Sequence, residues 1–138
     1  MDLVRAWTAA ILVFVAGSIA TAGIAISAAV SEDDLESVTG MLLWTAFPTF
    51  IVFALMALAG AAAHPSPQRD DTGRHALAML LVPGLATLLG IVLGVVQGSP
   101  AQTAAASAVA GLLGAIPTWW LLARRRARRS STGAYTGY

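Results

Sequence analysis

Four long runs of apolar residues constrain this chain more than any other feature of its sequence. None contains a charged residue: Ala6–Val30, Met41–Ala63, Ala76–Gln97 and Pro100–Ala123. A helix rises 1.5 Å per residue, so about 20 apolar residues cross the roughly 30 Å hydrocarbon core of a bilayer. A backbone in lipid must satisfy its own hydrogen bonds, and these runs lack the alternation of a barrel strand. The sequence therefore predicts four membrane-spanning helices.

The composition agrees with lipid as the solvent for this chain. Only 11% of its 138 residues are charged, 57% are hydrophobic and the mean hydropathy is +0.75. A soluble domain carries roughly 25% charged residues, and one of this length has too little interior to hide so much apolar surface. We therefore predict one all-α membrane domain over residues 1–129 and a flexible polar tail over residues 130–138. The absence of cysteine excludes disulfides and thiolate chemistry.

Residues between the third and fourth runs predict a tight hairpin. Ser99 would cap the fourth helix, Pro100 would stand at its first position and Gln102 would reach back to complete a capping box. Gly98 would end the third helix in a left-handed turn. The fold predicted from the four runs is thus two hairpins packed together.

The acidic segment Glu32–Glu36 predicts a short helical turn before the second run. Ser31 would cap it, and carboxylates are favourable at a helix N-terminus. We expect this turn to continue toward the second span, with Gly40 as the possible break. Divalent-cation binding by the carboxylates is an alternative that we consider weaker.

The distribution of arginines predicts the orientation in the membrane. With four spans, all eight basic residues fall on one side: Arg5, Arg69, Arg74, Arg124, Arg125, Arg126, Arg128 and Arg129. The acidic segment lies on the other. The positive-inside rule then places both termini in the cytoplasm (N-in/C-in), which makes the fold an antiparallel four-helix transmembrane bundle. Arginine without lysine, in an alanine- and glycine-rich chain, indicates a bacterial source and hence the bacterial cytoplasmic (inner) membrane.

An alternative treats the N-terminal run as a cleaved signal peptide. The run Ala6–Val30 exceeds the usual apolar core of about 7–15 residues, so we expect it to be retained as a span. Cleavage would also divide the arginines between the two faces of the membrane.

Small residues recur every four positions in the third and fourth runs, which places them on one helix face. These residues are Ala86, Gly90, Gly94 and Gly98, followed by Ser107, Gly111 and Ala115. Such a face lets two backbones approach closely in lipid. The ladders serve either packing within this bundle or binding of another subunit, and the second use is most plausible for the third run.

Prolines at positions 48, 83 and 117 lie within the runs. Each lacks an N–H, so the carbonyls of Trp44, Met79 and Leu113 lose their usual helical donor. We expect static bends there, with Pro83-Gly84 as the best candidate for a hinge.

The ends of the runs carry residues that favour the membrane interface. We expect Trp7, Trp44, Trp119 and Trp120 to act as interfacial anchors. The cluster Arg124, Arg125, Arg126, Arg128 and Arg129 is expected to contact anionic lipid headgroups. Nucleic acid is not an expected partner, because this cluster is juxtamembrane and has no binding fold around it.

No ionisable residue lies within the four apolar runs. A proton relay or an ion pathway would need such groups inside the membrane. His64 and His75 flank the cytoplasmic loop and are expected to be interfacial polar residues without a metal or haem. We therefore expect no catalytic, cofactor-binding or metal-binding residue, and no enzymatic activity.

Two hypotheses for function remain. The first is a non-catalytic accessory or structural subunit that docks against a larger bacterial membrane complex through small-residue helix faces. The alternative is a homo-oligomeric small channel, holin-like pore or transporter lined by hydroxyl groups. The expected partners are the lipid bilayer and other membrane subunits or further copies of this chain.

Overall fold

A computed structural model describes residues 2–64 and 71–133, without the side chains of residues 2, 72 and 126–133. The helices are α1 (Asp2–Ser27), α2 (Glu32–Glu36), α3 (Val38–Gly40), the π-helix η1 (Met41–Ala46), α4 (Phe47–Ala63), α5 (Thr72–Val96) and α6 (Ala101–Gly133). No strand occurs in these ranges. Four helical segments are long and apolar enough to cross a membrane, which confirms the predicted all-α class and the four candidate spans.

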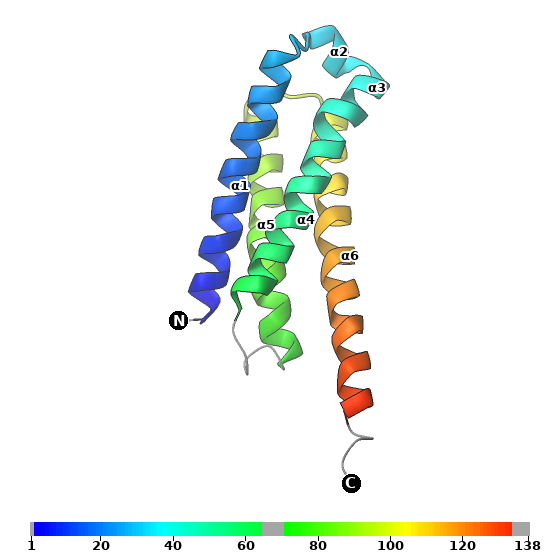
Figure 1. The fold of residues 1–138 in the computed structure, drawn as a ribbon. Helices are drawn as coiled ribbons and strands as arrows, with labels where there is room; N and C mark the ends of the chain where they lie inside the picture. The colour runs from blue at the N-terminus through cyan, green and yellow to red at the C-terminus, as the bar shows by residue number, and fades with distance from the viewer. Residues whose placement is uncertain (1, 65–70, 134–138) are drawn as a thin grey trace.

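The other three long helices pack around α4. This helix contacts α1, α5 and α6, and α5 in turn contacts α1 and α6. In Figure 1 the start of α1 and the end of α6 lie at the bottom, whereas α2 and the α5–α6 turn lie at the top. We call these the terminal end and the α2 end.

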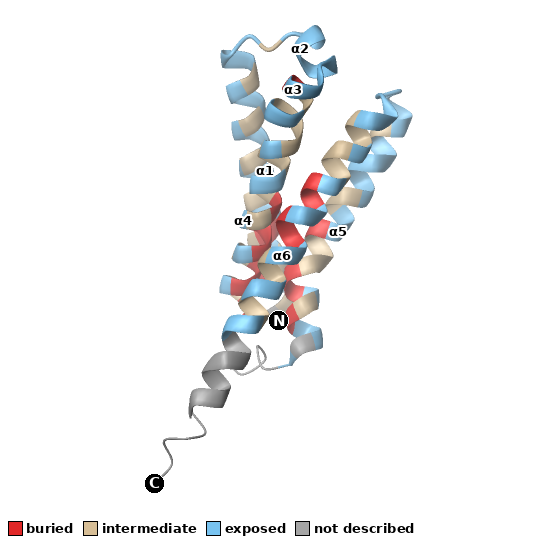
Figure 2. Ribbon diagram, turned by 90° about the vertical axis from the view of Figure 1, so that its right-hand side faces the viewer, coloured by how far each residue is buried: buried red, intermediate tan, exposed pale blue. Residues whose placement is uncertain are grey.

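Buried side chains gather toward the terminal end (Figure 2). One cluster joins Ala57, Ala61, Met79 and Ala115, and a second joins Ala10, Phe53 and Met56. Most of these residues are small because helices in lipid gain contact by close approach. Toward the α2 end, α1 diverges from the α5–α6 pair in Figure 2, while η1 stays in contact with α6.

The predicted acidic turn is α2, and its cap is the expected one. The Ser31 hydroxyl accepts from the Asp34 N–H at 3.1 Å, while the Asp34 carboxylate accepts from the Ser31 N–H at 3.0 Å. The hydrogen bonds that the Asp34 carboxylate receives from Ser31 lower its pKa below the ordinary value, because they favour the charged form.

The predicted break at Gly40 is wrong. Gly40 is helical, with φ −66° and ψ −40°, and the chain breaks at Ser37, which is extended at ψ 145°. The Ser37 hydroxyl accepts from the Gly40 N–H at 2.9 Å and so caps the next helix. Gly40 is needed for close approach, because a Cβ there would collide with the Asp34 carbonyl.

The turn between α5 and α6 confirms the left-handed glycine, since Gly98 has φ +70°. The Ser99 N–H donates to the Gly94 carbonyl and the Gly98 N–H to the Val95 carbonyl, at 2.9 and 3.2 Å. This is a Schellman cap. Helix α6 begins one residue later than predicted, because the Pro100 carbonyl, rather than that of Ser99, accepts its first bonds.

The three prolines within the spans have different surroundings. Pro48 lies in the first turn of α4 directly after η1, where the Phe47 N–H donates to Leu42. Pro83 and Pro117 lie inside continuous helices. Helix α6 also continues to Gly133, so residues 130–133 of the predicted tail are helical, whereas residues 134–138 lie outside the described residues.

Candidate functional site

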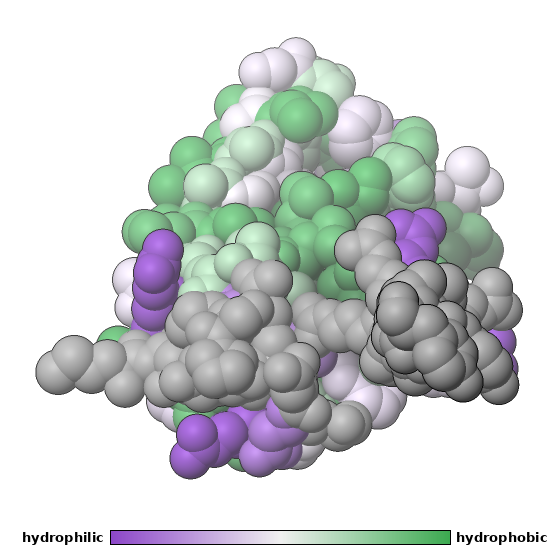
Figure 3. Space-filling model, turned by 60° about the horizontal axis from the view of Figure 1, so that its bottom comes forward, coloured by the Kyte–Doolittle hydropathy of each residue, from purple (hydrophilic) through white to green (hydrophobic). Residues whose placement is uncertain are grey.

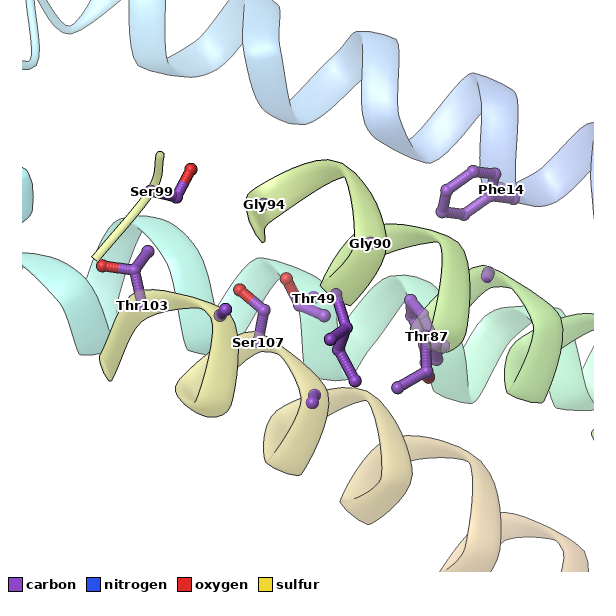
Figure 4. Close-up of a pocket in the computed structure, with 13 residues that line it drawn as sticks. Phe14, Thr49, Thr87, Gly90, Gly94, Ser99, Thr103 and Ser107 are labelled. Carbon is purple, nitrogen blue, oxygen red and sulfur yellow. The ribbon is translucent and has the colours of Figure 1, made fainter. Parts of the chain in front are cut away.

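A cleft of about 240 Å³ lies among the long helices in the half of the molecule toward the α2 end (Figure 4). Its walls are small residues, hydroxyl-bearing residues and a few larger apolar ones from α1, α4, α5 and α6. The lining residues are Phe14, Thr49, Phe53, Ala86, Thr87, Gly90, Ile91, Gly94, Ser99, Thr103, Ala104, Ser107 and Ala108. No charged residue is among them.

Hydroxyl groups supply the polar part of the lining of this cleft, which is otherwise apolar. Thr87 donates its hydroxyl to the Pro83 carbonyl at 2.9 Å, so its own helix uses that proton. Within the described residues, the Thr49, Thr103 and Ser107 hydroxyls make no side-chain hydrogen bond, and Figure 4 shows them beside the cavity. The cleft can therefore offer donors and acceptors to a guest, but no acid, base or nucleophile with an activating partner.

The two predicted ladders of small residues have different roles in the structure. Gly111 and Ala115 are buried against α4, where a Cβ on Gly111 would lie 2.9 Å from the Phe53 ring. On α5, by contrast, a Cβ on Gly90 would meet no atom within 4 Å, and one on Gly94 would meet only Ala104 and Ser99, at 3.6 and 3.9 Å. The α6 ladder is thus used for internal packing, while the α5 ladder lines the cleft.

The remaining ladder residues lie at the edges of these two regions. Ala86 is half-buried and packs against the cluster of Ala10, Phe53 and Met56. Ser107 is half-buried in the cleft wall, and Gly98 forms the turn at the end of α5.

His64 and His75 lie together inside the molecule, a burial that the sequence did not predict. Their exposed fractions are 0% and 3%, and their ring centroids are 5.9 Å apart. His64 ends α4 and His75 lies in the first turn of α5, so the intervening loop brings them together. Their positions beside the two span ends were the only signal for this pairing.

The predicted anchors make identifiable contacts. The Trp7 N–H donates to the Leu77 carbonyl at 3.2 Å, tying α1 to α5. Trp119 packs on the cluster around Met79, and its buried N–H has no hydrogen-bond partner among the described residues. Trp44 lines a groove between α1 and α4. Arg124 lies 3.8 Å above the Trp120 ring in a cation–π contact.

Arginine side chains are exposed at the terminal end. Figure 3 views this end and shows hydrophilic residues around it, with apolar surface behind them. The described exposed arginines are Arg5, Arg74, Arg124 and Arg125. The side chains of Arg126, Arg128 and Arg129 lie outside the described residues. The predicted headgroup contacts of all five arginines of this cluster stay a prediction.

Neither a cluster of metal ligands nor a similar protein assigns a function to this chain. No group of three His, Cys, Asp or Glu side chains comes together within the described part of the chain. No protein-family model, curated protein or solved structure matches the sequence or fold of this chain.

Proposed function

We propose that this protein is a non-catalytic accessory subunit that docks against a larger complex in the bacterial cytoplasmic membrane. The observation that carries the proposal is the cleft wall on α5, where Ala86, Gly90 and Gly94 leave helix backbone accessible beside hydroxyls. Helix association in lipid depends on close backbone approach and on interhelical hydrogen bonds. The cleft provides both and has room for a few side chains of a neighbouring helix.

The large uncovered surface of the spans supports a partner in the membrane. Between 6% and 22% of each apolar span is buried within the molecule, and α1 has the lowest share. Lipid covers such a surface adequately. Small residues and unused hydroxyls in a cleft gain more from a second helix than from lipid tails, which offer no hydrogen bonds.

We further propose that the bundle is antiparallel, with both termini in the cytoplasm. The exposed arginines at the terminal end and the acidic residues of α2 at the opposite end support this orientation. The indole groups of Trp7, Trp119 and Trp120 would then lie near the cytoplasmic interface, and that of Trp44 near the opposite one.

Co-purification with a matched pair of variants tests the docking proposal. A Cβ added to Gly90 or to Gly84 would meet no atom within 4 Å, so neither position is closed to a side chain by packing within this chain. Gly90→Leu fills the cleft, whereas Gly84→Leu lies outside its lining. We expect tagged wild type and Gly84→Leu to retain the same membrane partner in mild detergent and Gly90→Leu to lose it. Recovery of the wild type as a lone monomer would refute the proposal.

The hydroxyl lining favours a second candidate, a homo-oligomeric channel, holin-like pore or transporter. Five hydroxyl-bearing residues face this one cleft: Thr49, Thr87, Ser99, Thr103 and Ser107. If several copies surround a shared pore, liposomes containing only this protein should leak a small dye, and the leak should fall in a Thr103→Val/Ser107→Ala variant. Tight wild-type liposomes would exclude this candidate.

A further inference from the structure

The most unusual buried groups in the molecule are two imidazoles and a thioether near the terminal end of the α4–α5 contact. His64 and His75 are 0% and 3% exposed, and Met79 is fully buried. The largest fully buried side chains described are Met56, Met79 and His64, in a chain whose leucines are mostly on the surface. Nothing in the docking proposal uses this group.

Helical spacing brings Met79 to the same side of α5 as His75. The two residues are four positions apart, so their side chains are neighbours on one helix face. Met79 also packs against Ala57 and Ala61 on α4. Ala61 lies three residues before His64, on the face that continues into it. The two imidazoles and the thioether therefore lie at the same contact between α4 and α5.

The separation of the rings matches two ligands of one small ion. An imidazole–metal bond of about 2.0–2.1 Å, with about 1.1 Å more from the nitrogen to the ring centre, places the metal about 3.2 Å from each centre. The two centres can therefore be at most about 6.4 Å apart. The observed separation is 5.9 Å, with an angle of 32° between the ring planes. A bent two-imidazole arrangement is compatible with this distance.

We propose that His64, His75 and Met79 form a binding site for a monovalent copper ion. Imidazole suits copper, and thioether sulfur is a soft ligand that selects the cuprous state. Zinc prefers four ligands, and no third His, Cys, Asp or Glu side chain joins the pair within the described ranges. A single positive charge also costs less to remove from water than a double one, which favours a monovalent ion in this buried position.

Competition for cuprous ion in solution tests the site directly. The full chain is purified in detergent with a tag that contains no histidine and is titrated anaerobically against the chromophoric chelator bicinchoninate. We expect wild type to withdraw one copper ion per chain. His64→Gln and His75→Gln should each weaken binding at least about tenfold, because replacing even the outer-shell partners of metal ligands costs about 10–100-fold. Met79→Leu should weaken it as well.

Met56→Leu is the matched control, because Met56 is equally buried but belongs to the other cluster. Its affinity for copper should equal that of wild type. Failure of wild type to compete, or unchanged affinity in the double variant His64→Gln/His75→Gln, would overturn the proposal. If the variants do not fold, X-ray absorption of the copper-loaded wild type decides: nitrogen with sulfur ligands supports the site, and oxygen ligands alone refute it.

Discussion

Glycines on two of the long helices carry opposite structural demands in this protein. A Cβ on Gly114 would collide with the Phe50 carbonyl and come within 3.1 Å of the Ala54 nitrogen, whereas one on Gly90 would meet nothing within 4 Å. Backbone atoms of α4 have little freedom to move away from Gly114. This residue therefore sets the distance between α4 and α6, while Gly90 leaves a wall of the cleft open.

We predict that Gly114→Ala destabilises the protein and that Gly90→Ala does not. Overpacking of a tight contact costs about 1–3 kcal/mol. At Gly90 the added methyl group meets no neighbour, and alanine improves helix propensity by up to about 1 kcal/mol. Unfolding in increasing SDS, followed by tryptophan fluorescence, measures both changes. Equal stability of the two variants would contradict the assignment of Gly114 to a tight contact.

The sequence could predict which small residues share a face, but not which of them are enclosed. The spacing of Ser107, Gly111 and Ala115 placed them together on α6, as the structure has them. The α4 face that covers Gly111 and Ala115, with Phe53 and Ala57, follows from long-range packing that spacing does not encode. The open position of Gly90 depends on the same packing, and so the cleft was not predicted.

At the scale of elements, α2 depends on an ionised carboxylate. Hydrogen bonds from Ser31 lower the pKa of Asp34 below its ordinary 3.8. The folded pKa is thus below the unfolded one, so the carboxylate stabilises the cap above pH 3.8. That contribution is lost as the pH falls through the lower, folded value.

We predict that α2 frays in this acidic range while the four long helices remain. Backbone chemical shifts of the α2 amides, followed by NMR in detergent, should move toward coil values as Asp34 protonates. Asp34→Asn should show the frayed signals already at neutral pH, and Asp33→Asn should behave as wild type. An α2 that keeps its helical shifts through this range would show that the capping box is dispensable.

Element boundaries illustrate what local chemistry predicts well. The cap at Ser31 and the left-handed Gly98 were correct because each depends on a few neighbouring residues. The break at Ser37 was missed because a glycine is a common break signal, whereas here Gly40 is required inside a helix by its closeness to Asp34. The π-helix before Pro48 carried no recognised signal except the proline.

At the scale of the whole molecule, the proposed topology is testable because the chain contains no cysteine. Single replacements Ser99→Cys and Ser130→Cys place one thiol at each end of the proposed bundle. In intact bacterial cells, we expect an impermeant maleimide to label Ser99→Cys and to label Ser130→Cys only after the cells are opened. Labelling of both in intact cells would refute the orientation with both termini inside.

The pairing of the histidines also belongs to this scale. Eleven positions separate them, and only the packing of α4 on α5 decides whether the two rings meet. The sequence placed them correctly at the ends of two spans. It could not predict their burial, because polar residues at span ends usually face the headgroups.

The π-helix η1 changes which residues of the second span lie on the same face. A π-turn accommodates one residue more than an α-helical turn does. One residue corresponds to about 100° of rotation at 3.6 residues per turn. Residues on either side of Met41–Ala46 therefore follow two different helical phases. A face drawn from Phe47–Ala63 and extended backward would assign the wrong side of the helix to Trp44 and everything before it.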